Sequence, residues 1–243
     1  MKQETVVVKF GGHAMDKEEL CAAFAGDVAR LQQDGEKMVV VHGGGPQIGA
    51  LLQRLHIESR FEKGLRVTDA ATMEAVEMVL CGQVNKDVVA RLAAAGCRAA
   101  GVSGRDGGLL RARIKDAALG LVGDVTEVDA SLLACLLDGG FVPVVAPVAS
   151  GPQGQALNVN ADTAAGAVAG ALHKQLLPRL NRAEVQRLIE SDVINGGMIP
   201  KVQSCLYALD RGCGRSLILD GRQPSSLLRF LRDGEELGTV IEN

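Results

Sequence analysis

The sequence predicts the α/β class, as a three-layer αβα sandwich with helices on both faces of a mainly parallel open sheet. Short, continuous apolar runs alternate with helical segments up to residue 145, as they do when a parallel sheet is covered on both sides. Of the 243 residues, 47% are hydrophobic and 2% aromatic, so we expect an aliphatic core. The 30 glycines exceed the usual share of about 7%, and several stand in doublets or triplets, which indicates backbone held close to a ligand.

The chain begins with two strand–helix units. Residues 6–9 form the first expected strand, and Asp16 with Glu19 forms a capping box that begins the first helix. The second unit has a strand at 38–41 and a helix at 47–55, joined by a tight glycine-containing loop. This order predicts two neighbouring parallel strands.

The middle of the chain continues the alternation. Thr68 or Asp69 caps a long helix that runs to about residue 95. A turn at 103–108 precedes a hairpin, and Asp129 caps a leucine-rich helix. The remaining elements are expected at 99–102 (strand), 109–113 and 121–125 (hairpin), 130–138 (helix) and 142–145 (strand).

The alternation stops after residue 158. Three helices are expected at 160–172, 181–190 and 198–211, followed by a strand at 216–219. In a doubly wound sheet a helix is usually followed by a strand, so the pattern lacks a strand near 172–176.

Composition excludes several classes of protein. The net charge is −3 and the basic residues are spread along the chain, which argues against nucleic acid as a partner. No apolar run reaches the roughly 18–20 residues that a membrane span requires, and no signal-peptide core is seen, so we expect a cytoplasmic protein without a membrane anchor. The cysteines and histidines show no metal-ligand spacing, so we expect no metal centre.

Two glycine loops carry the first chemical signal. Gly11-Gly12 and Gly43-Gly44-Gly45 each follow a buried strand and precede a helix, which places both at the carboxyl edge of the sheet. Backbone N–H groups there are free to approach a phosphate or carboxylate. Neither loop matches the P-loop or the dinucleotide-binding fingerprint. The alternative is a pair of tight turns.

Two lysines stand where an anion would explain them. Lys9 interrupts an apolar strand, and Lys201 lies in the first turn of a helix, where positive charge is unfavourable. A strand-end lysine and a surface lysine are the alternatives. Asn158, Asn160 and Asp162 alternate before the alanine-rich helix expected at 160–172. Plain N-capping is the alternative for these three, but one helix needs only one N-cap.

Arg66 is a candidate for carboxylate binding. It follows a glycine and precedes a helix cap, so its guanidinium is expected to clamp a carboxylate with two hydrogen bonds. No Ser/His/Asp or Cys/His arrangement can be assembled, and His42 is equally well interpreted as a strand-end packing residue. Cations, backbone donors and one carboxylate are what direct phosphoryl transfer requires.

Five motifs, in this order along the chain, resemble those of the amino acid kinase family. The similarity extends over nearly the whole chain. It implies transfer of the ATP γ-phosphoryl group to the side-chain carboxylate of N-acetyl-L-glutamate, giving an acyl phosphate in arginine biosynthesis. The motifs are Val8-Lys9-Phe10-Gly11-Gly12, Val40-Val41-His42-Gly43-Gly44-Gly45, Gly64-Leu65-Arg66-Val67-Thr68-Asp69, Asn158-Val159-Asn160-Ala161-Asp162 and Gly196-Gly197-Met198-Ile199-Pro200-Lys201-Val202.

The resemblance also implies residue roles. Lys9 and Lys201 would neutralise the phosphoryl group, and Asp162 would hold both ammonium groups. Mg²⁺ would be carried by ATP. The implied phosphate-binding glycines are Gly11, Gly12 and Gly44, and the implied binding residues for the acyl amino acid are Gly44, Gly45, Arg66, Asn158 and Asn160.

The resemblance divides the chain into two lobes. Residues 1–157 would bind the acyl amino acid and form a dimer, and residues 158–243 would bind the nucleotide. Family members of this kind have a strand and a nucleotide-contacting loop after the alanine-rich helix, at the same place where the alternation lacks a strand. Either the sequence is not the whole gene product, which we favour, or a deletion has damaged the ATP site.

The quaternary structure is also an expectation. The motifs and Asp220-Gly221-Arg222 resemble an arginine-inhibited, hexameric subgroup, but Lys9 lies too close to Met1 for the N-terminal helix of that subgroup. We therefore expect a homodimer through the helices around 70–95, with a hexamer as the other possibility. Two alternative functions stay open: a kinase for another acyl amino acid such as acetylaminoadipate, and a catalytically inactive, amino-acid-binding regulatory homologue.

Overall fold

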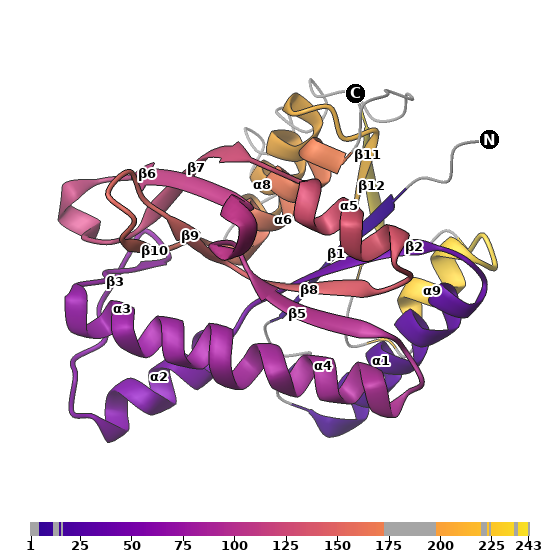
Figure 1. Ribbon diagram of the computed structural model, residues 1–243, viewed down its shortest axis with the longest axis horizontal. Coiled ribbons are helices and arrows are strands. Elements are labelled where there is room, and N and C mark those ends of the chain that lie inside the picture. Colours follow the sequence, from indigo (N-terminus) through magenta and orange to yellow (C-terminus); the bar gives the residue numbers. More distant parts are fainter. Residues whose placement is uncertain are drawn as a thin grey trace.

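A parallel sheet of four strands forms the centre of the protein (Figure 1). The computed structural model describes residues 5–11, 15, 17–172, 198–219, 223, 225–235 and 238–242, with the side chains of 198–200 left out. The strand order is β1-β2-β8-β5, and every neighbouring pair is parallel. The strands are β1 (Thr5–Phe10), β2 (Lys37–His42), β8 (Val142–Ala146) and β5 (Ala99–Ser103). The mainly parallel sheet expected from the sequence is confirmed.

The sheet has a helical layer on each face because the valines of β2 alternate between two cores. Val40 packs in one cluster with residues of the helices between α1 (Glu18–Gln33) and α4 (Asn85–Ala94). Val39 and Val41 pack in a second cluster with residues of α5 (Ser131–Asp138) and α6 (Ala161–Leu172). Successive side chains of a strand point to opposite faces, so a continuous run of valines buries both. The three-layer α/β fold is confirmed.

One helical layer contains α1 (Glu18–Gln33), α2 (Gly45–Arg54) and a long continuous segment, α3 (Ala70–Glu77), η2 (Met78–Val84) and α4 (Asn85–Ala94). The sequence predicts the long segment as one helix, and it is continuous, but its middle turn is π-helical. The predicted capping box at Asp16 is wrong, because Lys17 is the N-cap residue of α1; Asp16 itself lies outside the described residues.

A second, mixed sheet packs beside the first, with strand order β10-β9-β6-β7. In it β6 and β9 are parallel, and the two outer pairs are antiparallel. Its strands are β6 (Leu110–Ile114), β7 (Gly123–Val128), β9 (Val148–Ser150) and β10 (Ala156–Asn158). The hairpin predicted from the sequence is β6–β7. β9 and β10 have only three residues each, too few to show a period, and were not predicted. Along the chain, the helix α5 (Ser131–Asp138) lies between this hairpin and β8.

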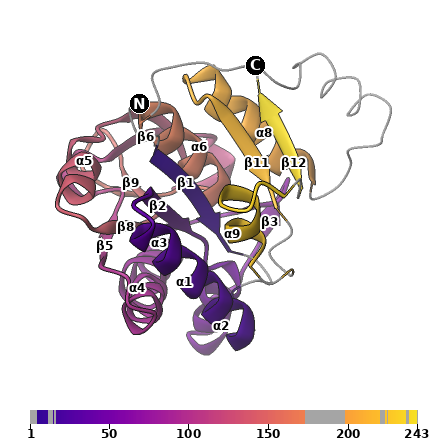
Figure 2. The ribbon, with the colours of Figure 1, turned by 90° about the vertical axis from the view of Figure 1, so that its right-hand side faces the viewer.

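The C-terminal part packs α6 (Ala161–Leu172) against α8 (Met198–Asp210) at close range. A Cβ on Gly166 would lie 2.9 Å from the backbone oxygen of Ser204, so this contact requires glycine. β11 (Arg215–Ile218) and β12 (Thr239–Glu242) form an antiparallel pair, and α9 (Ser226–Leu231) lies between them in sequence. Figure 2 shows α6, α8 and this pair gathered on one side of the central sheet. Leu172, where the sequence predicts that a strand is missing, is the last residue of α6, and residues 173–176 and the helix predicted at 181–190 lie outside the described residues.

No described helix combines the length and the apolar character that crossing a membrane requires.

The start of α3 supplies a stability test. The Asp69 side chain accepts a hydrogen bond from the Thr72 backbone N–H at 2.8 Å, which lowers the pKa of Asp69. Replacing an N-cap aspartate by alanine usually costs about 1 kcal/mol. We expect Asp69→Ala to lower the free energy of unfolding by about that amount in urea denaturation, whereas Asp69→Asn, which keeps the acceptor, stays close to wild type. Equal stability of Asp69→Ala and wild type would contradict the cap.

Candidate functional site

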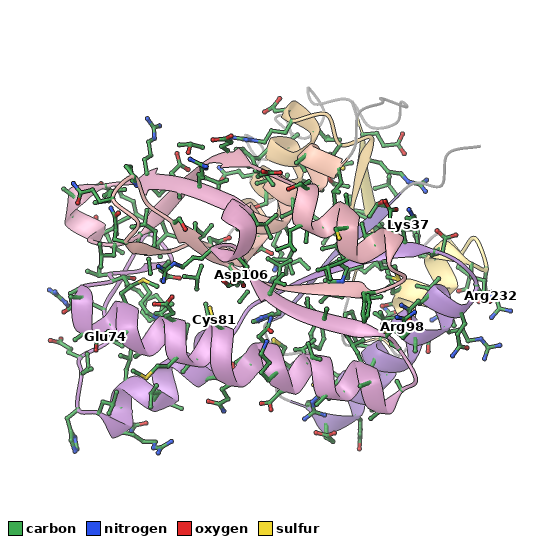
Figure 3. All side chains as sticks on the ribbon, viewed as in Figure 1. Lys37, Glu74, Cys81, Arg98, Asp106 and Arg232 are labelled. Carbon is green, nitrogen blue, oxygen red and sulfur yellow. The ribbon has the colours of Figure 1, made fainter. Side chains whose placement is uncertain are left out.

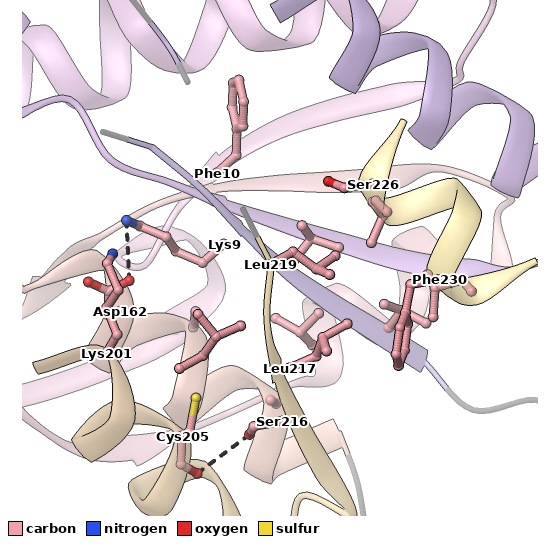
Figure 4. Close-up of a pocket in the computed structure, with 18 of the residues that line it drawn as sticks. Lys9, Phe10, Asp162, Lys201, Cys205, Ser216, Leu217, Leu219, Ser226 and Phe230 are labelled. Atoms are coloured by element: carbon pink, nitrogen blue, oxygen red, sulfur yellow. Dashed lines mark hydrogen bonds and ion pairs between the residues drawn. The ribbon is translucent and has the colours of Figure 1, made fainter. Parts of the chain in front are cut away.

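Three charged side chains from three elements meet at the carboxyl end of β1. Lys9 comes from β1, Asp162 from the first turn of α6 and Lys201 from the first turn of α8. The Lys9 Nζ lies 3.2 Å from the Asp162 Oδ1. Figure 4 shows both lysine side chains ending beside the Asp162 carboxylate. One carboxylate between two ammonium groups leaves this cluster with a net positive charge, so it is suited to hold an anion.

The cluster stands at one end of a cavity of about 380 Å³ that runs along β1 (Figure 4). β11, α8 and α9 line its other walls, where aliphatic and aromatic side chains such as Leu217 and Phe230 predominate. The Lys9 and Asp162 side chains are 24% and 21% exposed, so their charges are partly shielded from water but reachable from the cavity. Coulombic interactions are stronger at such a site than on an open surface.

The two glycine loops lie against each other next to Lys9. The Gly43 N–H donates to the Phe10 oxygen at 2.8 Å, which joins the ends of β2 and β1. A Cβ on Gly11 would lie 3.2 Å from the Lys9 Cε and 3.3 Å from the Gly43 nitrogen. Gly44 is the N-cap residue of α2, so the positive end of that helix dipole faces the same edge. Gly12 lies outside the described residues, as do Gly196 and Gly197.

Arg66 is buried at the start of α2. It extends from β4 (Leu65–Arg66), which pairs with β3 (Phe61–Glu62). Its Nη2 donates to the Gly45 oxygen at 3.0 Å, its Nη1 donates to Ser59 Oγ, and its guanidinium stacks over the Phe61 ring at 4.6 Å. Burial lowers the pKa of Arg66, but arginine stays charged. The guanidinium is therefore held rigidly beside the second glycine loop.

Asn158 is connected to the strand that carries Arg66. Its Nδ2 donates to Thr68 Oγ1 at 3.1 Å, and that hydroxyl donates to the Arg66 oxygen at 2.8 Å. Asn160 has a different contact: its Oδ1 accepts hydrogen bonds from the backbone N–H groups of Asp162, at 2.9 Å, and Thr163, so it caps α6. Asn160 thus fixes the helix turn that presents Asp162.

A buried polar pair beneath the glycine loop was not singled out from the sequence. His42, the last residue of β2, has no exposed surface, and Asn85, the first residue of α4, is 1% exposed. The Asn85 Nδ2 lies 3.2 Å from the His42 Nε2. The signal that was available is the position of Asn85, one residue after Val84 and three before Val88 on a helix whose apolar residues face the core.

His42 gives stability a dependence on pH. Burial lowers the pKa of His42 from 6.5 to about 4. Between these values the unfolded chain binds a proton at His42 that the folded protein does not, so stability falls as the pH is lowered. At about 1.4 kcal/mol per pH unit, this contribution amounts to about 3 kcal/mol.

We expect the difference in unfolding free energy between wild type and His42→Gln to shrink by about that amount as the pH falls from 6.5 to 4. A difference that stays constant over this range would contradict a neutral, buried His42. Should the variant fail to fold, NMR of the wild-type ring still gives the answer: ring shifts that titrate near pH 6.5 would contradict the lowered pKa.

Comparison with known proteins gives the family of this chain. The sequence model of the amino acid kinase family matches residues 4–220, and this chain belongs to that family. The chain is 45% identical to the acetylglutamate kinase of Rhodopseudomonas palustris strain BisA53 over 98% of this chain and 90% of that protein. It is 46% identical to the acetylglutamate kinase of Azorhizobium caulinodans over 97% of this chain and 88% of that protein.

A solved structure shares the fold over the full length. The crystal structure of smu.665 from Streptococcus mutans UA159 matches with a TM-score of 0.81 and 28% identity, covering 99% of both chains. The alignment with the Rhodopseudomonas enzyme extends over 269 positions, more than the 243 residues of this chain, so that relative carries residues with no counterpart here. The place of the missing segment, near residue 173, stays a prediction.

Proposed function

We propose that this protein is an acetylglutamate kinase, which transfers the γ-phosphoryl group of ATP to the side-chain carboxylate of N-acetyl-L-glutamate in arginine biosynthesis. The observation that carries the proposal is the arrangement at the carboxyl edge of the sheet, where the Lys9–Asp162–Lys201 cluster and the buried Arg66 are joined by two glycine loops. The identity of about 45% to acetylglutamate kinases over nearly the whole chain supports the same substrate.

The proposed chemistry is a direct displacement. An oxygen of the substrate carboxylate attacks the γ-phosphorus, the bond from that phosphorus to the bridging oxygen breaks, and ADP leaves. Both reactants are anions, so their repulsion opposes the approach. Lys9 and Lys201 would offset this charge, Asp162 would keep the two ammonium groups together, and the N–H groups of Gly11, Gly12 and Gly44 would donate to phosphoryl oxygens.

The acyl amino acid would bind on the α2 side of the glycine loops. Arg66 would pair with the α-carboxylate, and Asn158, two hydrogen bonds away through Thr68, would contribute an amide. Gly44 and Gly45 would approach the reacting carboxylate at the start of α2. Asn160 would also lie near the substrate, although its Oδ1 already accepts the two backbone hydrogen bonds that cap α6.

The nucleotide would lie on the opposite side, over the C-terminal lobe. The positive cluster at the mouth of the β1 cavity fits a triphosphate, because two lysines and a helix N-terminus converge there. Mg²⁺ would arrive on the ATP phosphates and help to neutralise them. The division into a substrate lobe at 1–157 and a nucleotide lobe at 158–243 stays a proposal, as does a cytoplasmic location.

A homodimer through the helices around 70–95 is proposed for the quaternary structure. Met78, in the middle of this segment, leaves 62% of its surface exposed. We expect wild type to sediment as a dimer at micromolar concentration and Met78→Glu to shift toward monomer, because a charge would be buried in the interface. If wild type sediments as a monomer, the dimer is contradicted. A sedimenting mass six times that of one chain would instead favour the hexamer.

The substrate is tested by ADP release from the purified protein with three acceptors: N-acetyl-L-glutamate, N-acetyl-L-aminoadipate and L-glutamate. We expect the highest kcat/KM for N-acetyl-L-glutamate. A higher value for the aminoadipate would favour the kinase for another acyl amino acid. Binding of an acyl amino acid without ADP release from any acceptor would favour the inactive regulatory homologue.

A further inference from the structure

The glycine loop at the end of β2 is held from beneath by the buried ring of His42. The His42 Nδ1 lies 2.8 Å from the Gly43 oxygen. A carbonyl oxygen only accepts, so Nδ1 must carry the ring proton and donate it. The other ring nitrogen, Nε2, then has a free lone pair, and the Asn85 Nδ2 is placed 3.2 Å away to donate to it. The two partners together select one tautomer of a neutral imidazole.

The Asn85 amide is itself fixed on several sides. Its Nδ2 also lies 2.9 Å from the Val144 oxygen on β8 and 3.3 Å from the Val102 oxygen on β5, so its two hydrogens are shared among three acceptors. Its Oδ1 accepts from the Lys86 Nζ at 2.9 Å. A Cβ on Gly101 would lie 2.0 Å from that Oδ1, so the glycine in the middle of β5 is what lets Asn85 reach its place. The amide cannot turn over, because its oxygen would then face the Val144 oxygen and the His42 lone pair.

The direction of one backbone N–H follows from these contacts. A trans peptide is planar, so the Gly43 oxygen and the Gly44 N–H point in opposite directions. Because His42 holds the oxygen toward the buried ring, the Gly44 N–H must point away from it. The Gly43 N–H is separately bound to the Phe10 oxygen at 2.8 Å, so the peptide groups on both sides of Gly43 are fixed.

We propose that His42 is a positioning residue that aims the Gly44 N–H at the transferring phosphoryl group, and that Asn85 selects the tautomer that allows it. This proposal rests on the proposed function, which identifies the anion as a phosphoryl group. In it His42 takes no part in proton transfer. The competing explanation is that His42 only packs under the loop, in which case an apolar side chain of similar size would serve.

Kinetics separate these two explanations. His42→Leu removes the donor to the Gly43 oxygen, and we expect kcat to fall roughly 10- to 100-fold with little change in the KM for N-acetyl-L-glutamate, somewhat less than the loss of a whole oxyanion donor. His42→Asn keeps a donor near the position of Nδ1 and should recover most of the loss. Leu92→Ala, a buried change on the same helix as Asn85, controls for lost stability and should keep kcat.

The proposal is overturned if His42→Leu keeps wild-type kcat, or if His42→Leu and His42→Asn lose the same amount. A second measurement needs neither substrate nor activity: long-range ¹H–¹⁵N NMR of the ring. We expect an Nδ1–H tautomer in wild type and a ring protonated at both nitrogens in Asn85→Asp, because the Gly43 oxygen still accepts from Nδ1 and a carboxylate accepts from Nε2. An Nε2–H tautomer in wild type would overturn the proposal, whereas the expected protonation states without ADP release would count against the proposed function alone.

Discussion

Replacing Lys9 by alanine is expected to lower kcat by about 10² to 10³, the effect of losing one group that stabilises charge in the transition state, while the KM for N-acetyl-L-glutamate changes little. The reason is the position of the Lys9 ammonium, 3.2 Å from Asp162 at the end of β1 and facing the cavity. In the proposed reaction its charge would be needed most when the substrate carboxylate and ADP, both anions, share the phosphoryl group. Steady-state kinetics at saturating ATP measure both constants.

Lys37→Ala is the matched control for this result. Lys37 lies at the opposite, amino-terminal end of the neighbouring strand β2 and pairs with Asp138 at 2.8 Å (Figure 3). The substitution Lys37→Ala removes a lysine charge from the same sheet, but far from the site, so kcat should stay near wild type. If Lys9→Ala kept a near-normal kcat while remaining folded, Lys9 would not be the catalytic lysine and the assignment of the site would be wrong.

Replacing Arg66 by alanine is expected to act on binding instead. Hydrogen bonds to a charged group are worth about 1.5–3 kcal/mol, so the KM for N-acetyl-L-glutamate should rise roughly 10- to 100-fold, with a smaller change in kcat. Arg66→Lys keeps the charge but loses the planar guanidinium, so its KM should lie between that of wild type and that of Arg66→Ala. Arg66 also supports the start of α2 through Gly45, so thermal unfolding of each variant should be measured alongside the kinetics.

Arg98→Ala provides the control for Arg66. The Arg98 guanidinium stacks over Phe141 at 4.4 Å, much as that of Arg66 stacks over Phe61, but Arg98 lies just before β5 (Figure 3). Loss of a cation–π contact alone should leave the KM unchanged. An unchanged KM in Arg66→Ala would contradict its proposed role in binding the α-carboxylate, and an equal rise in Arg98→Ala would show that the effect is not local.

The strands and helices that follow from local patterns were predictable, and so were the charged residues whose local setting is unfavourable. Lys9 in an apolar strand requires a nearby anion, and the structure supplies Asp162 at 3.2 Å. The alternation of buried strands and helices was enough for the parallel sheet. What these predictions share is that each depends on residues that are close in sequence.

The features that escaped prediction depend on residues far apart in the chain. Asn85 and His42 are 43 residues apart, and neither residue alone indicates a hydrogen bond to the other. The same holds for β9, in which Ser150 pairs with Arg111 of β6. The hydrogen bond from Arg66 to the Gly45 oxygen likewise joins residues 21 apart, which glycine and cap signals do not describe.

The most direct test of the account is to identify the product. The purified protein is incubated with ATP, Mg²⁺, N-acetyl-L-glutamate and hydroxylamine, which converts an acyl phosphate into a stable hydroxamate for mass spectrometry. We predict the side-chain hydroxamate of N-acetyl-L-glutamate, formed only with ATP and in equal amount to ADP. ADP released without hydroxamate, or hydroxamate formed only on another acyl amino acid, would contradict phosphoryl transfer to the side-chain carboxylate of N-acetyl-L-glutamate.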